Sequence, residues 1–126
     1  MSLDKDNINS AYRLGRLFAV LEKIQEEANP GINATIRERY YGAASANPVN
    51  VFATLLKLKN HYLGKLENPG RKTNFEKLLG EIFAEIPVDF PTSLSLQDQG
   101  RFAVGYYHQR QDFFTKRITN DQGESA

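Results

Sequence analysis

The sequence contains no cysteine among its 126 residues, so disulfide bonds and thiolate metal sites are excluded. Histidine is almost as scarce, because His61 and His108 are the only side chains of that type. Neither has a carboxylate three residues earlier, where Leu58 and Gly105 stand, so the Glu-x-x-His pairs of di-iron helical bundles are absent. The His-Glu-x-x-His motif of zinc proteases is absent too. We therefore predict no catalytic residue, no metal site and no cofactor.

Long apolar runs are also missing, and no stretch approaches the length that a membrane-spanning helix needs. Residues 1–10 are polar and lack the apolar centre of a signal peptide, so we expect a cytoplasmic protein with no membrane partner. No phosphate-binding loop, nucleophile elbow or calcium-binding loop is present, and we expect no small-molecule substrate. A hydrolase or nuclease that works through carboxylates or a tyrosine is the least favoured class.

What remains is the composition of an ordinary soluble domain, with 40% apolar and 25% charged residues. The length fits one domain, and no break in composition divides it. We predict a single domain over residues 1–126, with an ordered core at about residues 9–118 and polar tails at 1–8 and 119–126.

Apolar residues recur at steps of three and four, which is the period of amphipathic helices, and no stretch alternates as a strand would. The fold class predicted is all-α, a compact bundle of about five helices. Proline, glycine and asparagine separate them, and residues 42–46 are expected to form a loop or a frayed helix end. The helices are predicted at about residues 9–28, 33–41, 48–66, 73–86 and 95–117.

Several helix starts have recognisable capping residues. Asn9 or Ser10 is expected to cap the first helix, and Asn47 the third, where Pro48 suits the first helical position. The fourth helix is predicted to open at Thr73, because Thr73-Asn74-Phe75-Glu76 has the pattern of a capping box.

The final helix, predicted to start at Ser95, is apolar over nearly half its circumference. Gly100 and Gly105 each weaken a helix by about 1 kcal/mol relative to alanine, so we expect them to permit close packing. His108, Gln109 and Arg110 are candidates for polar contacts within the domain or across an interface. A helix this broadly apolar is either central in the bundle or packs one stripe on a partner. One apolar stripe comprises Phe102, Tyr106 and Phe113, and the other comprises Leu96, Ala103, Tyr107 and Phe114.

The net charge of +1 conceals a mild basic bias. Outside residues 1–8 and 119–126, 15 Lys and Arg face 11 Asp and Glu. Basic side chains predicted to point away from the apolar faces could grip phosphates, and they could equally be ordinary solubilising residues. The candidate nucleic-acid contacts are Arg16, Arg37, Arg39, Lys57, Lys59, Lys65, Arg71 and Lys72.

Residues 11–22, 32–45 and 94–102 together resemble a known family, as does the run Gly-Tyr-Tyr-His-Gln-Arg-Gln at 105–111. Over about residues 3–118 the chain resembles the C-terminal helical domain of the large subunit of the CRISPR type I-C Cascade complex. In that system the same segment is also made separately as the small subunit, from an internal start. A free chain beginning at Met1 resembles that product, and an excised domain beginning Met1-Ser2-Leu3 is the alternative.

The resemblance implies a role. Small subunits of Cascade pack along the backbone filament that holds the guide RNA, and they help hold the opened target DNA, especially its displaced strand. They carry no nuclease activity of their own. The expected partners are therefore the backbone and large subunits together with guide RNA and target DNA. The eight basic residues above come from charge and helix face alone, and a purely structural adaptor between protein subunits remains the alternative.

Overall fold

The computed structural model describes residues 3–31, 35–84, 86, 91 and 93–125, with side chains up to residue 115. This part of the chain forms helices without any strand, which confirms the predicted all-α class. The helices follow one another along the chain as α1 (Ser10–Ala28), α2 (Ile36–Ala46), α3 (Pro48–Lys65), α4 (Pro69–Ala84) and α5 (Leu96–Ser125).

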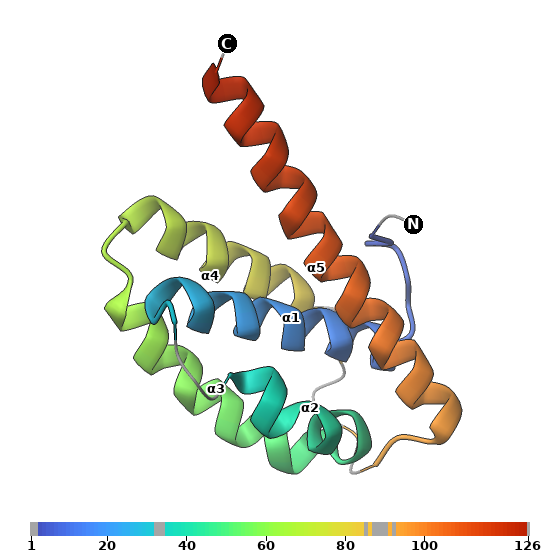
Figure 1. The fold of residues 1–126 in the computed structure, drawn as a ribbon. Helices are drawn as coiled ribbons and strands as arrows, with labels where there is room; N and C mark the ends of the chain where they lie inside the picture. The colour runs from blue at the N-terminus through green and yellow to red at the C-terminus, as the bar shows by residue number, and fades with distance from the viewer. Residues whose placement is uncertain (1–2, 32–34, 85, 87–90, 92, 126) are drawn as a thin grey trace.

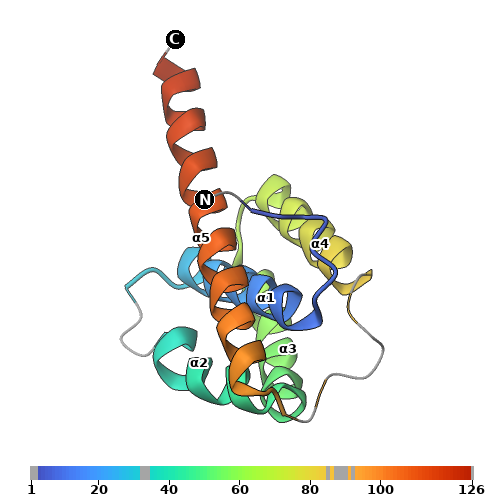
Figure 2. The same cartoon turned by 90° about the vertical axis from the view of Figure 1, so that its right-hand side faces the viewer.

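Helix α1 lies at the centre of the bundle, with α3, α4 and α5 packed around it and α2 beside it (Figures 1 and 2). Every residue from 11 to 21 is buried, although the sequence pattern predicts only one apolar face. The central helix is thus α1 and not the final helix. Small and apolar residues on its other sides, such as Ala11, Ala19 and Val20, allow neighbours to approach all round.

An aromatic cluster fills the core where α1, α2, α3 and α5 meet. The ring of Phe18 lies edge-on to Tyr41, Phe52 and Tyr106, with centroids 5.5, 6.5 and 5.6 Å away. Phe102 is tilted against it at 6.0 Å. Edge-to-face pairs at such distances add to the stabilisation from burial itself. Phe102 and Tyr106, which belong to one of the two apolar stripes of the final helix, are both buried.

Helices α1 and α5 cross so closely that their backbones touch at two glycines. A Cβ on Gly105 would strike the carbonyl of Tyr12, and one on Gly15 would strike the carbonyl of Phe102. The predicted packing role of Gly105 is therefore confirmed. The same role predicted for Gly100 is wrong, because a Cβ there would meet nothing within 4 Å.

The structure confirms some of the predicted helix starts and caps but not others. The side chain of Asn9 accepts a hydrogen bond from the Tyr12 amide, and that of Ser95 accepts one from the Asp98 amide. Asn47 makes no such side-chain cap, although Pro48 does occupy the first turn of α3. The amide of Asn47 instead donates a hydrogen bond to the carbonyl of Ala43 at the end of α2.

Helix α4 begins earlier than predicted, and the capping box at Thr73 does not form because Thr73 lies inside the helix. The cap is Asn68, whose Oδ1 accepts from the amides of Gly70 and Arg71 at 2.8 and 3.2 Å. Pro69 occupies the first helical position, where its missing N–H leaves no bond unmade. The Asn-Pro-Gly sequence therefore starts α4, whereas α3 already ends at Lys65.

Two other helices are longer than predicted. The small residues 42–46 belong to α2, which runs to Ala46, while its predicted start at residue 33 lies outside the described residues. Helix α5 continues to Ser125, beyond the predicted end near residue 117, and its last turns project away from the other helices (Figure 1). No proline interrupts that stretch. Within the described part of the chain, none of these helices is long and apolar enough to cross a membrane.

Candidate nucleic-acid interface

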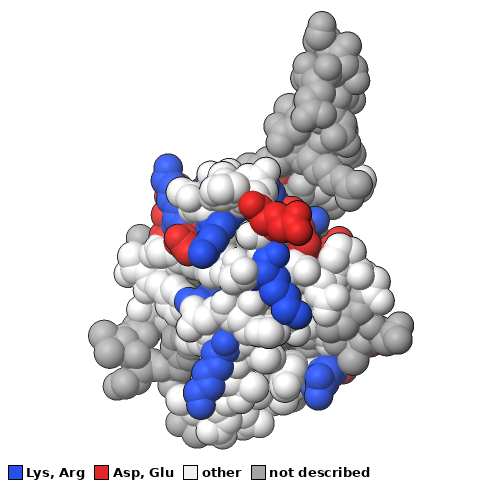
Figure 3. All heavy atoms as spheres, turned by 90° about the vertical axis from the view of Figure 1, so that its left-hand side faces the viewer, with Lys and Arg blue, Asp and Glu red and all other residues white. Residues whose placement is uncertain are grey.

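The eight basic residues proposed from the sequence do not form one continuous patch. On the face shown in Figure 3, Lys and Arg side chains lie apart from one another, and Asp and Glu side chains lie beside several of them. Lys59 is half-buried on α3, Arg16 is buried and Arg71 is partly exposed. The exposed members of the set are Arg37, Arg39, Lys57, Lys65 and Lys72.

Arg16 is not on the surface, and its prediction as an outward phosphate contact is wrong. Only 5% of the residue is exposed, because α5 covers the side of α1 that the helical pattern left polar. Its Nε donates to the Oε1 of Gln109 at 3.0 Å. Burial lowers the pKa of the Arg16 guanidinium from its ordinary value. This arginine joins α1 to α5 inside the bundle.

Arg71 is partly exposed, but its charge is already paired. Its Nη2 lies 2.6 Å from Oε2 of Glu27, and its Nε donates to Oε1 at 3.1 Å. The guanidinium also lies 4.8 Å from the centroid of the Phe75 ring. This bidentate pair fixes the start of α4 against the end of α1. Because Glu27 already balances its charge, Arg71 attracts a phosphate less strongly than an unpaired arginine would.

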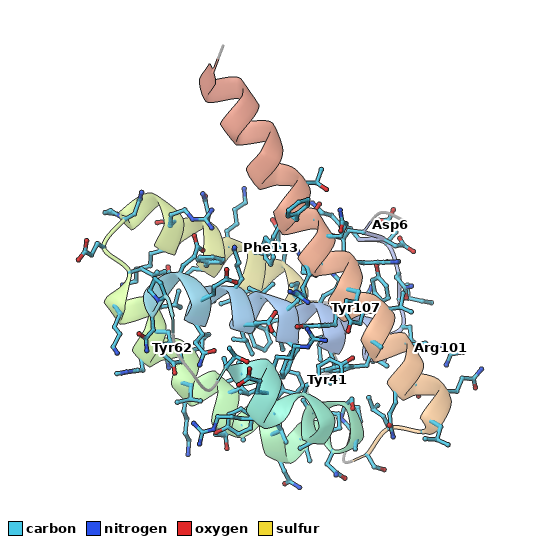
Figure 4. The ribbon with its side chains drawn as sticks, in the orientation of Figure 1. Asp6, Tyr41, Tyr62, Arg101, Tyr107 and Phe113 are labelled. Atoms are coloured by element: carbon cyan, nitrogen blue, oxygen red, sulfur yellow. The ribbon has the colours of Figure 1, made fainter. Side chains whose placement is uncertain are left out.

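Arg37 belongs to a cluster that joins α2 to α5. Its Nη2 donates to the hydroxyl of Tyr107 at 2.9 Å, and its guanidinium carbon lies 5.7 Å from the ring centroids of Tyr106 and Tyr107. Arg110 approaches Tyr106 as well, at 5.4 Å. Figure 4 shows Tyr41 and Tyr107 at this junction of the two helices. Arginines from two distant segments thus gather around adjacent tyrosines.

Beside this cluster lies a groove of about 650 Å³, lined by parts of α1 and α2 and by Arg110. Within it Glu22 accepts hydrogen bonds from the hydroxyl of Tyr106 at 2.7 and 2.8 Å, and lies 3.4 Å from Nε of Arg110. Burial, and next the bond to Glu22, raises the pKa of Tyr106 above its ordinary value. Because Glu26 and Glu38 also line it, the groove is of mixed charge and is not a basic channel.

The two histidines lie on different helices, His61 on α3 and His108 on α5. His61 is exposed on α3 beside the Tyr62 ring. The Nδ1 of His108 lies 2.9 Å from the hydroxyl of Tyr12, and that hydroxyl also accepts from the amide of Asp4. Among the residues described here, no group of three potential ligands is placed to hold a metal ion.

Comparison with known families gives the class of protein. The family model described as CRISPR-associated protein (Cas_Csd1) matches residues 1–114. The chain belongs to this CRISPR-associated family. The match spans all the side chains of the bundle that the structure describes except Thr115, including the arginine and tyrosine cluster. No curated protein matches the chain.

Membership of the Cas_Csd1 family confirms the resemblance to a CRISPR system and implies that the chain works within a CRISPR complex. Arg110, predicted from the sequence as a candidate for polar contacts, does contact Glu22, but neither it nor Tyr107 was among the eight basic residues proposed to bind nucleic acid. The fold brings both of them close to Arg37. The sequence held a signal, because Tyr107 and Arg110 are three residues apart and share one helix face. Nothing in the sequence indicated that α2 would place Arg37 beside Tyr107 and Arg110.

Proposed function

We propose that this Cas_Csd1-family chain is the non-catalytic small subunit of a CRISPR type I-C surveillance complex. In this role it packs along the backbone filament and contacts the large subunit, guide RNA and target DNA. Its exposed basic side chains hold target DNA, especially the displaced strand, through backbone phosphates. It cleaves neither DNA nor RNA itself and needs no cofactor.

The observation that carries the proposal is the family match over residues 1–114. The structure adds support at five positions, because Arg37, Arg39, Lys57, Lys65 and Lys72 are exposed on three helices. Spaced charges of this kind suit contacts to a sugar-phosphate backbone, where several weak interactions add up without base-specific recognition. Arg16 is no longer part of the proposed surface, since it is buried.

A structural adaptor without nucleic-acid contact is the second candidate, and one observation favours it. Helix α5 exposes large apolar side chains at Leu96, Val104, Tyr107 and Phe114, which are 86%, 44%, 48% and 57% exposed. Exposed apolar side chains at helical spacing are a common feature of protein-protein contacts. Both candidates place the chain inside the same complex, so only a measurement of DNA binding separates them.

Charge reversal in the assembled complex tests the proposal. Changing Arg37 and Arg39 to Glu should weaken binding of target DNA about equally for different target sequences. Each lost phosphate contact should also flatten the dependence of log affinity on log salt by about 0.7–0.9. Binding is measured by filter binding or fluorescence anisotropy over a series of salt concentrations.

The matched control reverses the same amount of charge at Lys77 and Arg101, which lie outside the proposed set on α4 and α5. We expect the control to assemble and to keep a steeper salt dependence. If reversal at Arg37, Arg39, Lys57, Lys65 and Lys72 together left affinity and salt dependence unchanged in an intact complex, the adaptor would be the correct function.

A further inference from the structure

The run at residues 105–111 divides its side chains between two environments. Gly105 contacts the backbone of α1, and Tyr106 and Gln109 are fully buried. Tyr107 and Arg110 instead lie on the open side of α5, with 48% of Tyr107 exposed. Packing against α1 explains the buried half of the run. It does not explain why an aromatic ring and an arginine stand together on the solvent side.

The ring of Tyr107 is held in place before any ligand arrives. Its hydroxyl accepts the 2.9 Å hydrogen bond from Arg37, and its ring lies edge-on to Tyr106 with centroids 5.1 Å apart. Tyr106 is itself fixed by Glu22 and by burial. An exposed aromatic side chain that is already ordered loses little conformational freedom on binding. Phe114 is a second exposed ring on the same helix and provides a comparison for Tyr107.

The charges nearby indicate what the ring would contact. Arg37 and Arg110 supply two cations around the tyrosines, while Glu22, Glu26 and Glu38 line the adjoining groove. Those carboxylates disfavour phosphate within the groove. A neutral, flat group is not repelled by them, and stacking on an aromatic ring is the interaction by which unpaired bases bind without sequence preference. Arg37, whose guanidinium carbon lies 5.7 Å from the centroid of the Tyr107 ring, can then contact a phosphate beside that base.

We propose that Tyr107, flanked by Arg37 and Arg110, is a stacking site for one unpaired base of single-stranded DNA. This inference rests on the proposed function, since it names a contact that the displaced strand makes. It adds base stacking to a contact with DNA that is otherwise purely electrostatic. It also separates Tyr107 from the remaining exposed apolar residues of α5.

The test compares three variants in the assembled complex, using a target whose displaced strand carries the fluorescent base 2-aminopurine at successive positions. In the wild-type complex we expect one position to be quenched by stacking. Tyr107→Ala should remove that quenching and weaken binding roughly 5- to 100-fold, the range of loss for one stacked base. Tyr107→Phe keeps the ring and loses only the hydrogen bond from Arg37, so it should keep the quenching and lose much less affinity than Tyr107→Ala. Phe114→Ala is the matched control that should change neither.

The dependence on salt distinguishes stacking from charge. Tyr107→Ala should lower affinity by the same factor at every salt concentration, whereas Arg37→Gln should flatten the salt slope. A second measurement leaves the protein unchanged: an abasic site at the quenched position should weaken wild-type binding, and one several nucleotides away should not.

Two failures have different meanings. If the wild-type complex binds DNA with a steep salt slope while Tyr107→Ala and the abasic site have no effect, the stacking site is wrong and the proposed function stands. If Tyr107→Ala and Phe114→Ala both impair assembly equally, Tyr107 belongs to a protein-protein contact and the inference is overturned. If removal of all five exposed basic side chains leaves DNA binding unchanged, the proposed function itself fails.

Discussion

At the scale of single residues, what surrounds a glycine decides its role. Gly15 and Gly105 lie where α1 and α5 cross, and a methyl group at either position would collide with a backbone carbonyl of the opposite helix. Backbone atoms cannot move aside as a flexible side chain can. Gly100 belongs to the same helix as Gly105, yet it faces open space.

Alanine substitution should therefore have opposite effects at these positions. Gly105→Ala and Gly15→Ala should each destabilise the fold by at least about 1–3 kcal/mol, because the helices must separate to admit the methyl group. Gly100→Ala should stabilise it by up to about 1 kcal/mol through helix propensity. Urea unfolding followed by circular dichroism measures all three. Similar gains at all three positions would show that helix propensity, and not the crossing, controls stability here.

Tyr106 should make stability sensitive to alkaline pH. Its folded pKa is raised above the ordinary value of 10.0, so the fold favours the neutral phenol. The corresponding stabilisation is complete below about pH 10 and is lost progressively as the pH rises further. Tyr106→Phe should make the loss of stability above about pH 10 less steep, as measured by urea unfolding at a series of pH values. Tyr41, whose pKa burial also raises, should leave part of the slope in place.

At the scale of helices, the ends were harder to predict than the cores. The apolar spacing predicted the five helices, and Asn9 and Ser95 were identified as possible caps from residue type alone. The Asn68-Pro69-Gly70 sequence has two valid interpretations, because Asn and Pro open helices as readily as Pro and Gly close them. The cap bonds from the amides of Gly70 and Arg71 to Asn68, together with the tertiary contact between Arg71 and Glu27, favour a start at Pro69.

The start of α4 can be tested with two alanine substitutions. Asn68→Ala should destabilise the fold by about 0.5–2 kcal/mol, because the amides of Gly70 and Arg71 lose their acceptor. Thr73→Ala should be neutral or slightly stabilising, since Thr73 is an exposed position inside a helix. Thermal unfolding of both variants gives the comparison. A larger loss at Thr73 would restore the capping box predicted from the sequence.

At the scale of the whole molecule, the sequence predicted the class of fold but not its centre. Arg13 and Arg16 gave α1 the appearance of a helix with one solvent-facing side, yet both residues are buried. The polar partner of Arg16 is Gln109, far along the chain, and a helical pattern carries no information about such pairs. The candidate site was limited for the same reason, because Arg37, Tyr107 and Arg110 meet only through tertiary packing.

The central position of α1 makes the fold cooperative. Leu21 and Leu55 contribute to one core from α1 and α3, and each is at most 2% exposed. Replacing either by alanine should cost about 2–5 kcal/mol. Circular dichroism and tyrosine fluorescence should then report the same unfolding midpoint, because no helix covers the core alone. Separate midpoints for the two signals would indicate a bundle that unfolds in parts.

The packing of α5 on α1 also has a consequence for synthesis on the ribosome. Helix α1 is translated well before α5, which covers it, and their contacts include Gly15 with Phe102 and Tyr12 with Gly105. Until α5 has left the exit tunnel, the face of α1 that it covers stays exposed, and contacts so distant in sequence form late. The core of this bundle is therefore completed only after α5 has been translated. Up to that moment the nascent chain presents apolar surface that chaperones bind.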